Sequence, residues 1–186
     1  QVWDRSSASF RSSTLAEFEP HQRARVAAFM PGGPYANLLA ERQVILQIGE
    51  NVFAHGGVLP EHVAYGIDEI NSSAQAWLRG EADLPSVLSG SNSPQWTRLY
   101  SDDPDSAACS VLEEALNALQ AKRIVVGHTI QESGIASACG RQAWRVDIGM
   151  AEYYATRTEY GGSVAVLEII GDSVRVINEL NREGDR

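Results

Sequence analysis

Two apolar runs in this sequence end at a histidine flanked by glycine, and this shared arrangement constrains the fold more than any other feature. The first run, Val-Phe-Ala-His-Gly-Gly, occupies residues 52–57, and the second, Val-Val-Gly-His-Thr, occupies residues 125–129. A short apolar run bounded by glycine is typical of a buried strand, and glycine lets the backbone turn sharply where the strand ends. Strand ends from one sheet can converge on a single cleft, so we expect His55 and His128 to lie together.

The remaining apolar periodicity predicts strands towards both ends of the chain with helices between them. The expected helices are 14–30 (one or two, around a proline), 35–40, 60–78 and 107–121; the expected strands are 44–48, 52–54, 124–126, 143–148, 163–169 and 173–177. Asp105 is placed to cap the last helix, and a Gly-Asp turn at 171–172 joins the last two strands as a hairpin. This order of elements favours an α/β sandwich over a helical bundle or a β-barrel.

The charge balance limits the partners of the chain. Lys and Arg total 15 against 24 Asp and Glu, a formal net charge of −9, so there is no general attraction for nucleic acid or anionic membranes. We therefore expect no nucleic-acid partner and no membrane partner, and a phosphorylated substrate would need a local positive site. The longest apolar runs are also far shorter than the roughly 20 residues that cross a bilayer.

The sequence contains two cysteines, Cys109 and Cys139, which are too few for a disulfide framework. We expect each of them to be a small buried apolar side chain rather than a ligand or a nucleophile. Reducing surroundings and a cytoplasmic location are the corresponding expectation.

The paired histidines are the strongest candidates for chemistry. A neutral imidazole is a common metal ligand, and the rigid end of a strand fixes its direction. A single histidine at a strand end is more often a structural residue, but two in the same context favour a metal site formed by His55 and His128. His62 follows the first motif closely and is a weaker candidate for supporting a ligand.

These motifs resemble those of a known family. Residues 51–60 resemble the F-x-H-G-G-[LIV]-x-P segment of the phosphoprotein phosphatases, which are calcineurin-like metallophosphoesterases, and residues 125–129 resemble their later G-H-T segment. Further segments resemble the subgroup called Shewanella-like protein phosphatases: 31–36, 133–135, 139–140 and 145–150. The resemblance extends from about residue 30 to residue 178.

The resemblance implies a fold and a site. The fold would be the C-terminal part of a four-layer αββα metallophosphoesterase sandwich. Two divalent metal ions (Mn, Fe or Zn) would activate a hydroxide that attacks phosphorus, and His55 and His128 match the two histidines of the second metal. Arg98 matches an arginine that contacts substrate phosphate, and this role is favoured over that of an ordinary surface arginine. Asp147 either orients a ligand or caps a turn.

The chain also departs from the family. Intact members carry G-D-x-H-G, G-D-x-x-D-R-G and G-N-H-E segments before the first histidine motif, and this sequence has none of them. We therefore expect a C-terminal portion: residues 1–30 as an irregular or helical remnant, 31–180 as part of the phosphoesterase domain, and 181–186 as a tail. With only part of a metal shell, the isolated chain is expected to bind metal weakly and to be inactive.

The expected function is that of a metal-dependent phosphatase acting on a phosphorylated protein or peptide. Phosphoserine or phosphothreonine and phosphotyrosine substrates are both open. One alternative is a phosphohydrolase of small molecules or dinucleoside polyphosphates, because related bacterial enzymes share the G-H-T segment. The other is a non-catalytic binding protein with a decayed site, against which stands the presence of both histidines and Arg98.

Overall fold

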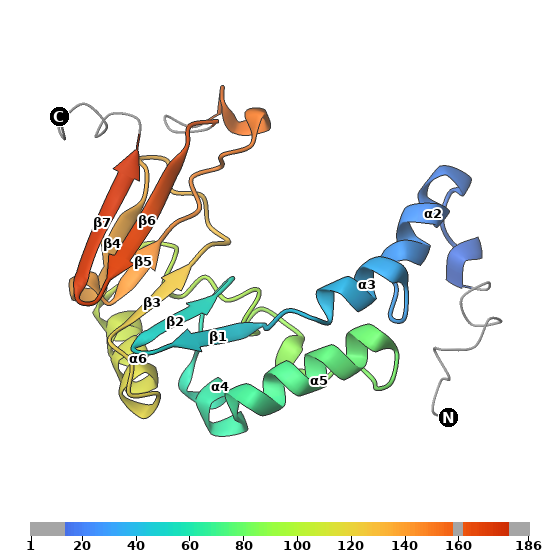
Figure 1. Ribbon diagram of the computed structural model, residues 1–186, viewed down its shortest axis with the longest axis horizontal. Helices are drawn as coiled ribbons and strands as arrows, with labels where there is room; N and C mark the ends of the chain where they lie inside the picture. The colour runs from blue at the N-terminus through green and yellow to red at the C-terminus, as the bar shows by residue number, and fades with distance from the viewer. Residues whose placement is uncertain (1–13, 158–161, 179–186) are drawn as a thin grey trace. The chain divides into compact units, whose positions relative to one another are not determined.

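A computed structural model of the chain describes residues 14–157 and 162–178. The chain divides into two compact units, one formed by residues 1–44 and 65–90 and the other by residues 45–64 and 91–186 (Figure 1). The expected remnant at 1–13 and the expected tail at 181–186 lie outside the described residues. The division at residues 30 and 180 stays a prediction.

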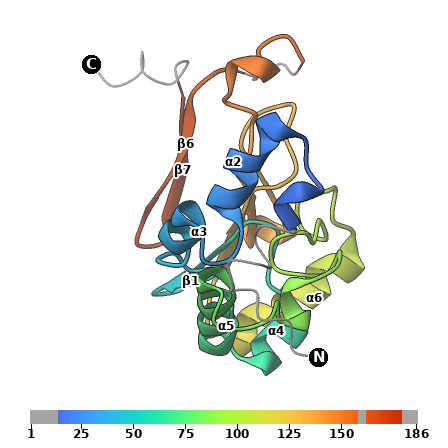
Figure 2. The ribbon, with the colours of Figure 1, turned by 90° about the vertical axis from the view of Figure 1, so that its right-hand side faces the viewer.

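The first unit is helical. It contains α2 (Pro20–Phe29), α3 (Pro34–Leu39), α5 (Ile67–Arg79) and the short 3-10 helix η1 (Ser86–Leu88). Within it, α3 contacts both α2 and α5, as Figure 2 shows. Helix α3 begins at Pro34, where the missing N–H costs nothing, and α5 ends at Gly80 in the left-handed conformation.

The second unit is built on a five-stranded mixed sheet in the order β1-β2-β3-β5-β4. Its strands are β1 (Ile45–Ile48), β2 (Asn51–Ala54), β3 (Arg123–Val126), β4 (Ala136–Ala138) and β5 (Ala143–Arg145). The three middle strands are parallel, and β3 is buried along its whole length, as a central parallel strand should be. Ala54 pairs with Val126, so β2 and β3 end level at one edge of the sheet.

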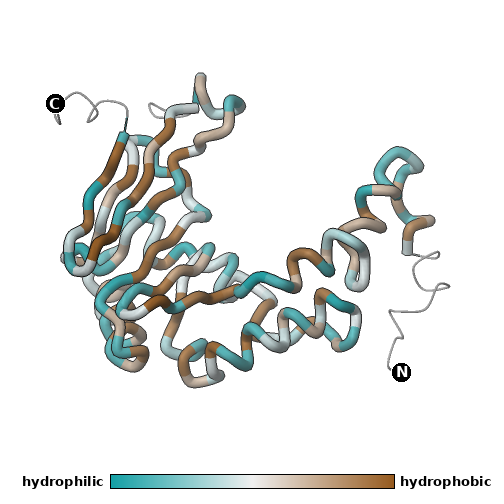
Figure 3. The backbone as a smooth tube through the Cα atoms, viewed as in Figure 1, coloured by the Kyte–Doolittle hydropathy of each residue, from teal (hydrophilic) through white to brown (hydrophobic). Residues whose placement is uncertain are grey.

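Two helices, α4 (Pro60–Tyr65) and α6 (Ser106–Ala118), belong to this unit. The side chain of Asp105 accepts a hydrogen bond from the amide of Ala108 at 2.8 Å, which confirms the predicted cap. Helix α6 buries Leu112 and Leu116, and the positions of hydrophobic residues along the strands and helices of this unit are brown on the backbone tube in Figure 3. Burial of such side chains supplies the main stabilisation of the unit.

One predicted helix is in fact two. The apolar spacing over 60–78 predicts a continuous helix, but the chain breaks between α4 and α5 at Gly66, whose φ is 104°. An L side chain rarely adopts this backbone conformation, so glycine allows a break that periodicity alone does not reveal. The two helices then fall into different units.

A separate two-stranded sheet follows the main sheet in the chain. Strands β6 (Ala165–Ile170) and β7 (Ser173–Asn178) pair antiparallel, and Gly171 in their turn has a φ of 57°. The predicted hairpin is therefore confirmed, with bounds shifted by one or two residues. The predicted strand at 143–148 was too long, since β5 ends at Arg145, and β4 was not predicted at all.

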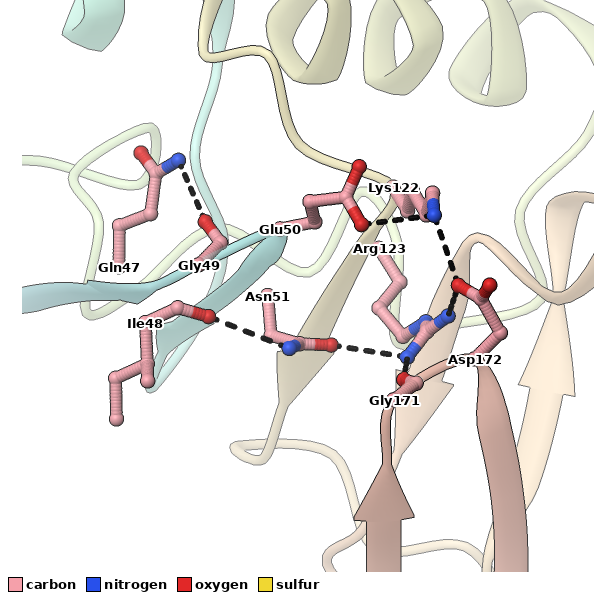
Figure 4. A network of polar contacts seen from close by, with 9 residues as sticks. All are labelled: Gln47, Ile48, Gly49, Glu50, Asn51, Lys122, Arg123, Gly171 and Asp172. Carbon is pink, nitrogen blue, oxygen red and sulfur yellow. Dashed lines mark hydrogen bonds and ion pairs between the residues drawn. The ribbon is translucent and has the colours of Figure 1, made fainter.

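The start of β3 is tied to two turns by a polar cluster, the Lys122–Asp172 network (Figure 4). Lys122 forms ion pairs with Glu50 at 2.7 Å and with Asp172 at 2.8 Å. The guanidinium of Arg123 donates to the side chain of Asn51 at 3.0 Å and to the carbonyl of Gly171 at 3.3 Å. The network thereby connects the β1–β2 turn, β3 and the β6–β7 turn.

The two cysteines form a disulfide, which corrects the prediction that they are separate apolar side chains. Cys109 in α6 is bonded to Cys139, the first residue of the 3-10 helix η2 (Cys139–Arg141), across a sequence separation of 30 residues. Whether Cys109 and Cys139 meet depends on how the β4–β5 connection returns beside α6, and the spacing of the two residues in the sequence does not contain that information. The disulfide restricts the unfolded chain by closing a loop.

No helix within residues 14–157 and 162–178 is long and apolar enough to cross a membrane.

Candidate metal centre

The two predicted ligand histidines lie together beyond the level ends of β2 and β3. Nε2 of His55 is 3.1 Å from Nδ1 of His128, and the ring centroids are 4.9 Å apart. The amide of Gly127 donates to the carbonyl of His55 at 2.9 Å, which extends the β2–β3 pairing up to the histidines. The parallel register therefore brings the two imidazoles into one cluster, as the sequence predicted.

His128 is held in an unusual backbone conformation. Its φ of 65° lies in the left-handed region, which is uncommon for a residue with a side chain. Nη1 of Arg98 donates to the carbonyl of His128 at 3.0 Å and to Oγ1 of Thr129 at 2.7 Å. Thr129 Oγ1 is also 2.7 Å from Oγ of Ser101. These contacts offset the backbone strain and fix the direction of the imidazole.

The surroundings of His128 favour its neutral form. Partial burial is the main factor that lowers its pKa, and the nearby Arg98 and His55 lower it further. A neutral imidazole is the form that binds a metal ion. The nitrogens that face each other are Nε2 of His55 and Nδ1 of His128, and these two are placed to bind one ion together.

The chemistry of these donors fits a divalent metal ion, but the described residues complete no metal site. Within residues 14–157 and 162–178, no group of three or more His, Cys, Asp or Glu side chains is placed to hold a metal. A catalytic metal site usually has three protein ligands and an open position. His55 and His128 therefore supply part of one coordination shell.

The glycines of the first motif are required by close packing. The amides of Gly56 and Gly57 both donate to the carbonyl of Pro94, at 2.8 and 3.0 Å. A Cβ added at Gly56 would lie 2.7 Å from the carbonyl oxygen of Thr97, and one at Gly57 would lie 3.0 Å from the Thr97 side chain. Since backbone atoms cannot give way, glycine is needed here for the 93–98 segment to pack against the turn after β2.

The 93–98 segment brings two further side chains to the histidines. Arg98 is exposed and donates into the His128–Thr129 loop, so it lies beside the histidines. Within the described residues its hydrogen bonds use only Nη1, which leaves its other guanidinium nitrogens open to solvent or a ligand. The ring of Trp96 lies edge-to-face with that of His128 at 5.2 Å and 84°.

Sequence analysis missed several members of this cluster. Gln131 donates from Nε2 to the carbonyl of Ser101 at 3.0 Å and to that of Thr129 at 2.8 Å. It thereby joins the loop after Arg98 to the loop after His128. The threonine could have been found, because it belongs to the G-H-T segment; isolated polar residues such as Ser101 and Gln131 carry no periodic or motif signal.

The weaker candidates have structural roles. His62 is 2% exposed, and its Nδ1 accepts a hydrogen bond from the amide of Leu59 at 3.0 Å at the start of α4. Burial lowers its pKa, so it is a neutral buried residue. The carboxylate of Asp147 accepts from the amide of Gly149 at 3.0 Å, and its charge also raises the pKa of His128.

Comparison with known proteins gives relatives but no family model, since none matches this sequence. Shewanella-like protein phosphatase 2 of Arabidopsis thaliana is 39% identical over 170 residues, which cover 87% of this chain and 42% of the plant protein. An uncharacterized protein of Schizosaccharomyces pombe is 28% identical over 160 residues, which cover 81% of this chain and 46% of the yeast protein. The chain thus spans less than half the length of these two relatives.

Two solved structures are similar to this one. A cold-active protein tyrosine phosphatase matches with a TM-score of 0.52 and 25% identity over 69% of this chain and 42% of the other. The cold-active protein-tyrosine phosphatase of a psychrophilic Shewanella species matches with a TM-score of 0.50 and 27% identity over 59% of this chain and 35% of the other. These likenesses confirm the predicted α/β fold class and agree with part of the predicted sandwich.

Proposed function

This chain is related to the Shewanella-like protein phosphatases over most of its length, and we propose on that basis that it forms part of a metal-dependent phosphoprotein phosphatase. The observation that carries the proposal is the convergence of His55, His128 and Arg98 at the end of the parallel strands. Imidazole nitrogens are common ligands of divalent cations, and a guanidinium beside them suits the phosphate that such a cation would bind.

The proposed site needs ligands that the described residues do not supply. The plant relative is more than twice as long as the matched region, so we place the remaining ligands in the part of the protein that this chain does not cover. A dinuclear centre of Mn, Fe or Zn, when bound, polarises the phosphoryl group and lowers the pKa of bound water. The isolated 186-residue chain is accordingly proposed to be inactive.

The residues of this chain have separate roles in the proposal. His55 and His128 hold one metal ion through imidazole nitrogens. The open guanidinium nitrogens of Arg98 bind phosphate oxygens in a fixed fork, while its Nη1 holds the loop that carries His128. The substrate is a phosphorylated protein, and the solved neighbours that are described as protein tyrosine phosphatases favour phosphotyrosine.

Substitution of the histidines tests the proposal in the full-length protein that contains this chain. His55→Ala and His128→Ala should each lower kcat/KM for p-nitrophenyl phosphate with Mn²⁺ by about 100-fold or more, because each removes a metal ligand. Metal analysis should show a matching loss of bound ion. His21→Ala is the control, since this exposed histidine lies in α2 of the other unit.

Two results would overturn the proposal. Wild-type protein without bound Mn, Fe or Zn would indicate a non-catalytic protein. A double His55→Ala, His128→Ala variant with wild-type activity would place the chemistry elsewhere. Preferential hydrolysis of a dinucleoside polyphosphate over a phosphopeptide would move the substrate class to the small-molecule alternative.

A further inference from the structure

We propose that Trp96 determines substrate specificity, with its indole forming a surface against which the aromatic ring of a phosphotyrosine lies. The inference rests on the proposed phosphatase function and assigns to that site a residue that selects aryl over alkyl phosphate esters.

The exposure of Trp96 is the first observation. Within this chain Trp96 is 60% exposed, whereas the next residue, Thr97, is 4% exposed, so the indole projects from a turn whose neighbouring residue is buried. Large aromatic side chains contribute most when they are removed from water, and here the fold leaves most of that surface unused. An exposed tryptophan beside a candidate site is therefore available to a ligand.

The rigidity of its backbone is the second observation. The amides of Trp96 and Thr97 both donate to the carbonyl of Ser93 at 3.0 Å, which closes a tight turn. The carbonyl of Pro94 accepts from both glycine amides of the histidine motif, and the packing there has no room for a Cβ. The indole is thus presented from a fixed backbone, which reduces the entropy lost when a ligand binds.

The position relative to the site is the third observation. The indole lies edge-to-face with the ring of His128 at 5.2 Å, and Trp96 is two residues from Arg98. A phosphate bound by Arg98 beside the two histidines would have its ester group next to this tryptophan.

The chemistry of the ester then decides what the tryptophan contacts. In phosphotyrosine the ester oxygen is bonded directly to an aromatic ring, whereas in phosphoserine it is bonded to a single aliphatic carbon next to the peptide backbone. Aromatic pairs in offset-stacked or edge-to-face arrangements are stabilised beyond the effect of buried area. Contact with Trp96 should therefore favour the aryl ester.

The experiment compares two peptides of the same sequence, one with phosphotyrosine and one with phosphoserine, in the full-length protein. Trp96→Ala should lower the ratio of kcat/KM for phosphotyrosine to that for phosphoserine by about 10-fold. Trp96→Phe should keep the ratio within about 2-fold of wild type, because an aromatic face remains. Tyr153→Ala, which removes an aromatic residue that is 63% exposed, is the control and should leave the ratio unchanged.

A binding measurement separates this proposal from the proposed function. Phosphotyrosine peptide should quench the intrinsic tryptophan fluorescence of the inactive His55→Ala variant. Adding Trp96→Phe should abolish the quenching, because the tryptophans that remain fluoresce but do not contact the peptide. If wild type hydrolyses neither peptide, the phosphatase proposal fails, and the quenching still decides the role of Trp96. Equal losses for both peptides in Trp96→Ala, or quenching that survives Trp96→Phe, would overturn the assignment.

Discussion

The two ends of the parallel strands in the second unit carry polar clusters of opposite character. At the start of β3, the Lys122–Asp172 network pairs each cation with a carboxylate, a carbonyl or an amide oxygen. At the far end, His55, His128 and Arg98 bring potential cations together. Each cation of the first cluster has an oxygen partner within the fold, whereas the second cluster is the one to which we assign the proposed metal ion.

The pKa shifts show the same contrast. In the network, hydrogen bonds to Asp172 and Glu50 raise the pKa of Lys122, and the bond from Lys122 lowers the pKa of Asp172, so each partner favours the charged form of the other. At the site, burial and neighbouring cations lower the pKa of His128 and disfavour its charged form. Mutually favourable charges are typical of a structural contact, whereas a histidine whose pKa is lowered by burial beside other cations is what the proposed metal site would need.

The largest effect that would sharpen this comparison is expected at Arg98. Arg98→Ala should lower kcat/KM of the full-length protein about 100-fold, because it removes a phosphate contact and frees the loop that carries His128. The melting temperature should fall only slightly, because the two hydrogen bonds that are lost lie at the exposed surface. Arg98→Lys should have a kcat/KM between those of wild type and Arg98→Ala, because lysine keeps the positive charge without the planar fork of donors. Full activity in Arg98→Ala would break the comparison; Arg25→Ala in α2 is the matched control.

At the other end of the strands the effect should be on stability. Arg123→Ala should lower the free energy of unfolding by about 1–3 kcal/mol, since Asn51 and the carbonyl of Gly171 would lose their partner. Denaturant titration measures the loss, and kcat/KM of the folded variant should stay near that of wild type. A large fall in kcat/KM with unchanged stability would show that the two ends do not divide the roles in this way.

His62 tests a pH dependence of stability that arises in the buried core and not at the candidate site. Burial lowers its pKa in the folded protein below the ordinary value of 6.5, so the unfolded chain binds the proton more readily. Stability contributed by its neutral form is fully present above pH 6.5 and is lost as the pH falls through the lowered folded pKa. His62→Gln should flatten the decline in melting temperature between about pH 7 and pH 5. An identical decline in both proteins would contradict this.

The smallest effect is expected at Lys122. Its side chain is 47% exposed, against 10% for Arg123, so Lys122→Ala should lower the melting temperature less than Arg123→Ala does. The difference in melting temperature from wild type should shrink in about 1 M salt, where the screening length is roughly 3 Å, because salt screens exposed ion pairs. A larger loss than that of Arg123→Ala would reverse the ranking of the two contacts.

The sequence predicted those features that depend on local pattern. Alternating and continuous apolar runs placed β2, β3 and the β6–β7 hairpin, and their shared endings predicted the approach of His55 and His128. The features that were missed depend on tertiary structure. Gly66 breaks a helix only because its φ is positive, and β4 is three residues long with few apolar atoms. The proposed role of Trp96 depends on its ring contact with His128, which is distant in the sequence.

The disulfide described above has a topological consequence for the site. Because Cys109 and Cys139 are covalently joined, residues 109–139 form a closed ring of bonds. That ring includes His128, Thr129 and Gln131. A protease that cuts once inside the ring opens the polypeptide without releasing either piece. Such a nick would leave the mass on a non-reducing gel unchanged and would become visible only after reduction, so integrity of the site loop has to be judged under reducing conditions.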